Sequence, residues 1–144
     1  MSSAVPADVL LDEPWLSIRW DRLHRCVHAE FKHFATSAEF RGGTTKILDA
    51  IRARGATAVV SDNRRLEGVT NLDQLWLRDS WLPLAVAAGI NRLAVVVARH
   101  GLGKVATEAI LGKFEKTAFQ THMFDSLPEA LKWTSQALAC IPPA

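Results

Sequence analysis

Polar residues directly follow two runs of strand-forming residues, where an α/β protein commonly binds its ligand. These residues are Asp62, Asn63, Arg64, Arg65, Arg99 and His100. Ligands of open α/β sheets bind beyond the carboxyl ends of the parallel strands. If the two strands are neighbours, these side chains converge on one crevice, and guanidinium groups hold phosphate or carboxylate groups well. We therefore predict an anion-binding crevice; the alternative is that Asp62 caps its own loop and the arginines are solvated.

A glycine-rich segment after the second run has part of the pattern of a phosphate-binding loop. The segment is Gly101 to Lys104, with the sequence GLGK. The complete pattern needs a glycine where Ala98 stands, and a serine or threonine where Val105 stands. Without that hydroxyl the magnesium ligand is missing, so we do not expect a nucleotide-hydrolysing loop.

Two further sets of residues could carry chemistry, as a metal site or as an acid–base pair. His24, Cys26 and His28 are two residues apart, so on a strand they would share a face that could hold zinc. His24, however, lies in the expected turn, and no fourth ligand is evident. Asp62 and His100 could form an acid–base pair across the crevice. We favour a non-enzymatic protein with no catalytic residue, metal or cofactor, and the acid–base enzyme is the least favoured alternative.

The composition is typical of a single globular domain covering residues 1–144. Of the 144 residues, 49% are hydrophobic and 22% are charged, which is enough for one core. The net charge of +2 is too small to indicate nucleic-acid binding. We expect no signal peptide and no membrane span. Cys26 and Cys140 form no zinc motif and favour a reduced, cytoplasmic chain, with one disulfide between them as the alternative.

Hydrophobic periodicity predicts the element order β-β-α-β-α-β-α-β-α. Strands are expected at 15–20, 26–32, 58–61, 93–98 and 119–123, and helices at 36–55, 70–89, 104–116 and 126–138. Strands that alternate with helices favour a largely parallel sheet, here opened by an antiparallel hairpin. The prediction is an α/β fold with a five-stranded mixed sheet and about four helices, preceded by a flexible arm at residues 1–13.

The hairpin residues alternate between apolar and polar, which predicts one core face and one solvent face. The expected core residues are Ile18, Val27, Ala29 and Phe31, and the expected solvent residues are Ser17, Arg19, His28 and Glu30.

The helical segments carry three local features. Thr36 and Glu39 have the spacing of a capping box. Two glycines, Gly42 and Gly43, cost helix stability, so we expect close packing against a neighbouring backbone there, with a functional hinge as the alternative. Pro83 lacks an amide hydrogen and predicts a kink or break in its helix.

Trp76 and Trp81 are candidates for an interface. They lie about 140° apart around the helix, so one should face the core and the other a flank. Tryptophan is enriched at interfaces. We expect self-association through this helix or through the open sheet.

The order and spacing of these segments resemble the STAS-like family, in its sporulation anti-sigma-antagonist-like branch. The resemblance covers roughly residues 15 to 138 and rests on two groups of residues: Trp76, Trp81, Pro83, Ala85 and Gly89, and the segment FDSLPEALKW from Phe124 to Trp133. It implies an α/β sandwich that is commonly dimeric, with no established enzymatic activity. Relatives in the wider fold bind partner proteins, and some bind nucleotides or lipids.

In the classical regulatory members, a partner kinase phosphorylates a serine that follows an aspartate after the third strand. Here Asp62 matches the acid, but Asn63 stands in the place of that serine. Ser61 and Thr70 do not match it either, so the resemblance does not carry the kinase switch to this chain. We expect a dimeric regulatory module that binds a protein partner. The alternative is a protein that binds a small anionic ligand, such as a nucleotide, lipid or metabolite, in the crevice.

Overall fold

One sheet forms the centre of the molecule. The computed structural model describes residues 8–114 and 119–139, and within them the strands lie side by side in chain order in a six-stranded sheet. The strands are β1 (Asp8–Asp12), β2 (Leu16–Asp21), β3 (Cys26–Phe31), β4 (Ala58–Asp62), β5 (Arg92–Val96) and β6 (Gln120–Phe124). The first three pair antiparallel and the last four pair parallel, so the sheet is mixed.

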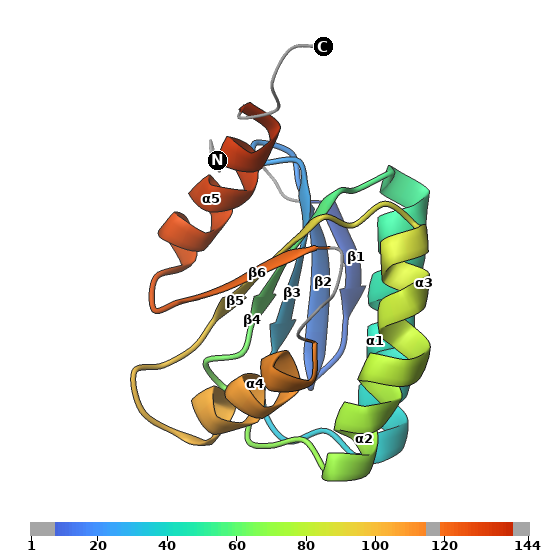
Figure 1. Ribbon diagram of the computed structural model, residues 1–144, viewed down its shortest axis with the longest axis vertical. Coiled ribbons are helices and arrows are strands. Elements are labelled where there is room, and N and C mark those ends of the chain that lie inside the picture. The colour runs from blue at the N-terminus through green and yellow to red at the C-terminus, as the bar shows by residue number, and fades with distance from the viewer. Residues whose placement is uncertain (1–7, 115–118, 140–144) are drawn as a thin grey trace.

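Helices cover the two faces of the sheet unequally (Figure 1). They are α1 (Ser37–Arg54), α2 (Asn71–Trp76), the π-helical turn η1 (Leu77–Trp81), α3 (Leu82–Ala87), α4 (Leu102–Lys113) and α5 (Leu127–Ala139). The helices α1 and α2–η1–α3 cover one face, and α4 lies at the end of the sheet where β4 and β5 finish. On the other face α5 packs on β4, β5 and β6. At the start of β3, Cys26 is also buried in the cluster under α5, whereas no described helix packs on this face of β1, β2 and the rest of β3.

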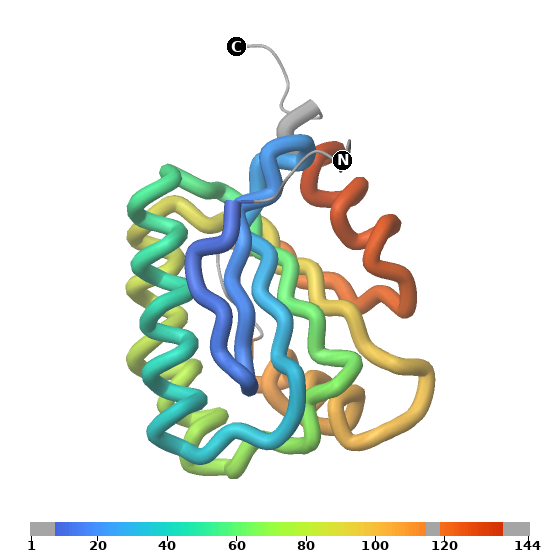
Figure 2. The backbone as a smooth tube through the Cα atoms, turned by 180° about the vertical axis from the view of Figure 1, so that it is seen from behind, coloured from blue at the N-terminus to red at the C-terminus, as the bar shows by residue number. Residues whose placement is uncertain are grey.

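The first strand corrects our prediction of a flexible arm at residues 1–13 and of five strands. Asp8–Asp12 pairs with β2 as an edge strand, and residues 1–7 lie outside the described residues. The register shifts between Val9 and Leu11, which indicates a bulge. A bulge breaks the alternation of side chains that identifies a strand in a sequence, and this explains the missed strand. Figure 2, turned by 180° from Figure 1, shows β1 at the front, at the edge of the sheet.

The hairpin of β2 and β3 has the predicted register. Its apolar face is buried, with Ile18 1% exposed and Phe31 4% exposed. The opposite face is less open than we expected, because Ser17 is also buried, between its cross-strand neighbours Asp12 and Glu30. The hairpin therefore has a polar face, but that face is not simply a solvent face.

The helix pair on the main core face is tied together by one buried carboxylate. Asp73 accepts hydrogen bonds from Ser37 Oγ at 2.7 Å and from Arg41 Nε at 2.8 Å. Burial alone would raise the pKa of Asp73, but these hydrogen bonds outweigh it and lower the pKa. The guanidinium of Arg41 also lies 5.2 Å from the ring centre of Trp76. These contacts fix α2 against the first turns of α1.

The capping box is confirmed, and the predicted break at Pro83 is a π-helical turn. Thr36 and Glu39 each bind the other's backbone amide, at 3.1 Å and 2.9 Å. Before Pro83, the amide of Leu82 donates to the carbonyl of Leu77, five residues back. Such a turn widens the helix and accommodates the proline without ending it.

The two adjacent glycines of α1 differ in their surroundings. A Cβ at Gly43 would lie 2.6 Å from atoms of both Trp15 and Leu16, whereas a Cβ at Gly42 would meet nothing within 4 Å. Close packing therefore explains Gly43, and the contact is with side chains rather than the backbone that we expected. No packing contact accounts for Gly42.

Candidate functional site

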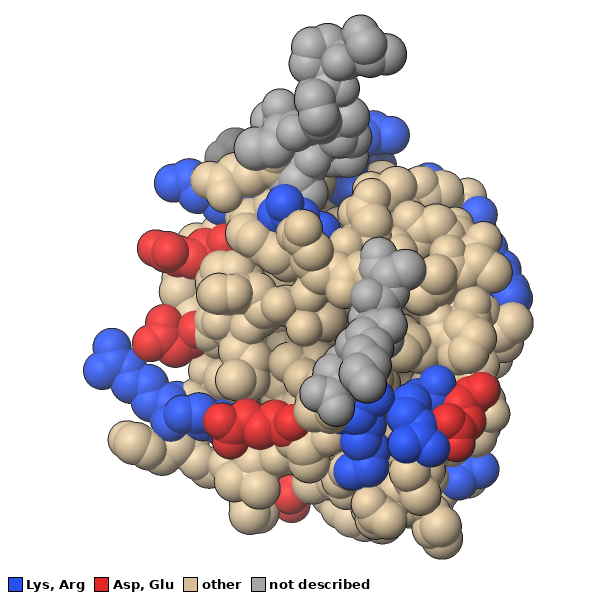
Figure 3. All heavy atoms as spheres, viewed as in Figure 1, with Lys and Arg blue, Asp and Glu red and all other residues tan. Residues whose placement is uncertain are grey.

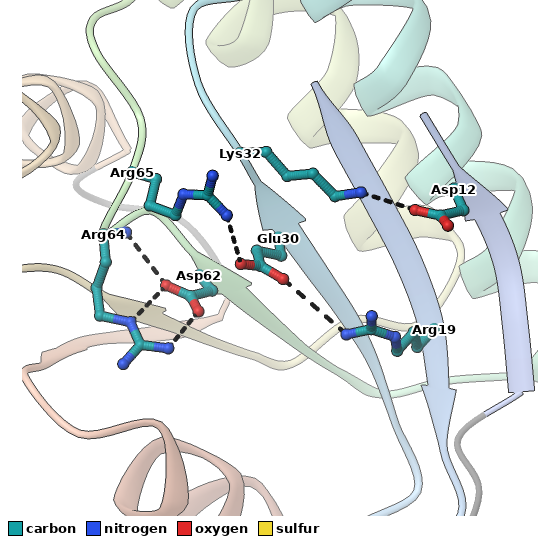
Figure 4. Close-up of polar contacts among 7 residues, drawn as sticks. All are labelled: Asp12, Arg19, Glu30, Lys32, Asp62, Arg64 and Arg65. Carbon is teal, nitrogen blue, oxygen red and sulfur yellow. Dashed lines mark hydrogen bonds and ion pairs between the residues drawn. The ribbon is translucent and has the colours of Figure 1, made fainter. Parts of the chain in front are cut away.

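The strand end at β4 separates the residues that we predicted to share one crevice. Asp62 is 3% exposed and lies beside Glu30 on the face of the sheet opposite α1, which we call the open face because no described helix covers it beyond α5. Arg64 turns back to it, with Nε 2.9 Å from Oδ1 and Nη2 2.6 Å from Oδ2, and the Arg64 amide donates to the same carboxylate (Figure 4). The pKa of Arg64 is raised by these hydrogen bonds. Arg64 is thus held by an internal acid and is not aimed at a ligand.

Arg65 also lies on this open face, where an acid stands between two arginines. Glu30 Oε2 is 3.8 Å from Arg65 Nη1, and Glu30 Oε1 is 4.0 Å from Arg19 Nη1 (Figure 4). Arg65 remains mostly exposed, at 62% of its side chain. Ion pairs of this length and exposure contribute little to the free energy of folding, so their main effect is to orient the side chains on this face.

Asn63 points into the core on the opposite side of the sheet. Ser61 Oγ donates to Asn63 Oδ1 at 2.7 Å, and Asn63 Nδ2 donates to Thr107 Oγ1 at 2.9 Å. This chain of hydrogen bonds joins the end of β4 to α4. Its role is structural, because Asn63 is 6% exposed.

Gly103 lies directly against the loop that follows β4. A Cβ at this position would lie 2.4 Å from the carbonyl oxygen of Asn63 and 2.9 Å from that of Leu66. Only glycine permits this approach. The first turn of α4 is therefore seated on the backbone of residues 63–66.

Arg99 and His100 line an open crevice at the ends of β5 and β6. Its volume is about 550 Å³ and its walls are Val97, Ala98, Arg99, His100, Lys104, Met123, Phe124, Asp125 and Glu129. This volume lies within the usual range of small-molecule sites, roughly 300–1,000 Å³. Charges of both signs appear at the left of Figure 3, near the start of α5.

The cations of this crevice are available for a ligand. Arg99 Nε lies 3.2 Å from Asp125 Oδ2, but the two side chains are 82% and 54% exposed, so the pair is weak. The N-cap residue of α4 is Gly101, which has no side chain, so no side chain of that residue caps the amides of the first turn. Such amides favour an anion.

The six predicted ligand residues therefore lie in three places: Arg99 and His100 in the crevice, Asp62, Arg64 and Arg65 on the open face, and Asn63 in the core. Asp62 does not line the crevice, so the acid–base pair that we considered with His100 is not assembled. The crevice adds Lys104, Asp125 and Glu129, which the prediction missed. Asp125 follows β6 as Arg99 follows β5, so the same strand-end rule could have found it.

A second cavity lies inside the core. It measures about 70 Å³ and is bounded mainly by apolar side chains of the sheet, α1 and α4, with Asn63 and Thr107 on its wall. This volume is too small for a metabolite. The cavity is a packing feature of the junction between β4 and α4.

The residues considered for zinc do not form a site. His24 Nδ1 lies 3.1 Å from Asp21 Oδ1. Burial lowers the pKa of His28, and it raises the pKa of the Cys26 thiol to about 12. No group of three potential ligand side chains is found among the residues that the structure describes. Cys26 is a free cysteine, and Cys140 lies outside the described residues.

The two tryptophans divide between core and flank. Trp81 is 7% exposed and its indole N–H donates to the Thr44 carbonyl at 2.6 Å. It is therefore occupied within the chain. Trp76 is partly exposed beside Arg41, and an interface role for it stays a prediction.

A scan against models of known protein families finds no match, and a search of curated proteins also finds none. The STAS-like resemblance therefore stays a prediction. None of the described helices combines the length and the apolar character that crossing a membrane requires.

Proposed function

We propose that the protein works by binding a small anionic ligand in the crevice at the ends of β5 and β6. The observation that carries this proposal is the placement of Arg99, His100 and Lys104 around one 550 Å³ crevice, with Lys104 in the first turn of α4. The proposed site contains fewer of the predicted residues than we expected from the sequence, because Arg64 and Arg65 pair with acids on the open face.

The charges of the crevice define the class of ligand. A phosphate or carboxylate group fits the amides of the first turn of α4, with Arg99 and Lys104 beside it. The carboxylates of Asp125 and Glu129, on the same crevice, accept hydrogen bonds from hydroxyl or amino groups. We propose a small metabolite that carries an anionic group at one end and hydroxyl or amino groups at the other.

The second candidate is a STAS-like regulatory module, dimeric and cytoplasmic, that binds a protein partner. Leu102 and Val105 favour it, because they are 65% and 63% exposed on the first turns of α4. Exposed apolar side chains beside a functional crevice are typical of a contact surface. The two candidates are compatible if the ligand changes how this surface meets a partner.

Calorimetric titration with phosphate-bearing and carboxylate-bearing metabolites tests the proposal. The panel is chosen by native mass spectrometry of the protein purified from its own cell. Arg99→Ala and Lys104→Ala should each weaken binding by about tenfold to a hundredfold, since one charge-assisted hydrogen bond contributes about 1.5–3 kcal/mol.

Arg64→Ala is the matched control, because Arg64 is occupied by Asp62 and lies outside the crevice. It should bind as the wild type does. A ligand whose affinity falls in Arg64→Ala and not in Arg99→Ala would place binding on the open face and contradict the proposal.

A further inference from the structure

The two edges of the sheet differ in how they are protected against pairing with another strand. At one edge, β1 carries Asp8 and Asp12 and has a bulge. Charges and bulges are the usual devices that prevent edge-to-edge association. At the other edge, β6 has the sequence QTHMF, with no charged residue, no proline and a continuous register against β5. Within the described residues, the β6 edge therefore carries neither of these devices.

The backbone of β6 offers hydrogen-bonding groups away from β5. The Gln120 amide donates to the Asn91 carbonyl at 3.0 Å, and the Val97 amide donates to the Phe124 carbonyl at 2.8 Å. Because the direction of backbone groups alternates along a strand, Gln120, His122 and Phe124 face β5. The amides and carbonyls of Thr121 and Met123 consequently point outward from the sheet.

We infer that β6 of a second copy of this chain pairs antiparallel with this edge, about a two-fold axis at His122. Thr121 of one copy then faces Met123 of the other, and the two equivalent pairs exchange about four main-chain hydrogen bonds. The two His122 residues form the central pair, where no hydrogen bond is exchanged and the side chains approach closely. The two sheets become one continuous sheet.

A second copy fits this edge because the strand brings no like charges together across the axis. The surface at the centre of Figure 3, where described residues are visible, likewise shows no charged side chain. Aromatic side chains flank the edge on the α5 side, with ring centres of Phe124 and Trp133 lying 4.6 Å and 6.0 Å from that of His122. Met123 is partly buried on the other side. These groups supply apolar contact on both faces of the joined strands.

This inference deepens the dimeric part of the second candidate function and does not depend on the ligand crevice. Sedimentation equilibrium at tens of micromolar should show a dimer for the wild type. Thr121→Pro removes an outward amide without removing a bond to β5, and Thr121→Lys places a charge on the edge. Each should raise the dimer dissociation constant at least tenfold. Val9→Lys, on the exposed part of β1, is the matched control and should remain dimeric.

Amide exchange of the wild type supplies a test that needs no substitution. The Thr121 and Met123 amides should be protected at high protein concentration and exchange freely on dilution, while the Gln120 amide stays protected at both. A monomeric wild type would overturn both this inference and the dimeric function. If the dimer survives both Thr121 substitutions and the Thr121 and Met123 amides are unprotected, the pairing through β6 is wrong but the dimeric function stands. The pairing through β6 is also wrong if this edge binds an added peptide strand and not a second copy of the chain.

Discussion

Replacing Gly103 by alanine tests whether the first turn of α4 is seated on the loop after β4. The new Cβ would lie 2.4 Å from the Asn63 carbonyl oxygen and 2.9 Å from that of Leu66, where observed Cβ contacts essentially never fall below 3.0 Å. Both neighbours are backbone atoms, so they cannot rotate away as a side chain can. The helix or the loop must shift by roughly half an ångström, and overpacking of this kind costs about 1–3 kcal/mol.

Gly112→Ala in the same helix is the matched control. A Cβ there would meet nothing within 4 Å, and the backbone is helical. The substitution should therefore stabilise the protein by about 0.5–1 kcal/mol, because alanine loses less conformational entropy on folding than glycine does. Urea unfolding followed by circular dichroism measures both variants. A Gly103→Ala protein that is as stable as Gly112→Ala would refute the seating of α4.

Three further predictions concern the core and the helical layer. Gly43→Ala should be less stable than Gly42→Ala in thermal unfolding, because only the first adds a clash. Its cost should be smaller than that of Gly103→Ala, because the atoms it meets belong to the side chains of Trp15 and Leu16, which can move. Gly42→Ala should stabilise by up to about 1 kcal/mol. Cys26 should react with a thiol reagent only after unfolding, since its pKa is about 12 and it is buried; rapid labelling of the folded protein would contradict this. Asp73→Asn should destabilise by about 1.5–3 kcal/mol at neutral pH through weakened bonds to its partners. The pKa of Asp73 is lowered, so its contribution is full above the ordinary carboxyl range, near pH 4, and is lost as the pH falls through the folded pKa; denaturation curves of wild type and variant should therefore converge in acid.

Most helices and strands could be predicted from the sequence, because buried apolar residues recur at the regular spacing of a helix or a strand in this fold. The hairpin alternates since one face is core, and Leu93–Val96 is apolar on both sides since helices cover both faces of β5. The edge strand β1 was missed because its bulge interrupts the alternation. The proline predicted a break in its helix, but a sequence does not tell whether the chain stops or widens into a π turn.

The sequence predicts some features of the site and not others. The direction of a side chain on a strand can be predicted from alternation, but the ion-pair partner of an arginine cannot. Counting along β4 places Asn63 on the same face as Val59, so its burial in the core follows from alternation alone. The partners of the arginines could not be counted in this way. Arg64 folds back on an acid two residues away, and Arg65 reaches Glu30 on the neighbouring strand, which depends on strand order.

The central claim is that the start of α4 and its neighbouring cations form an anion site. The most direct measurement is a titration of isotope-labelled protein with inorganic phosphate, followed through the backbone amide signals in NMR spectra. The account predicts saturable shifts at Leu102, Gly103 and Lys104, preserved in Arg64→Ala and weakened about tenfold or more in Arg99→Ala. Unchanged amide signals at the start of α4 in the wild type, up to high millimolar phosphate, would contradict it.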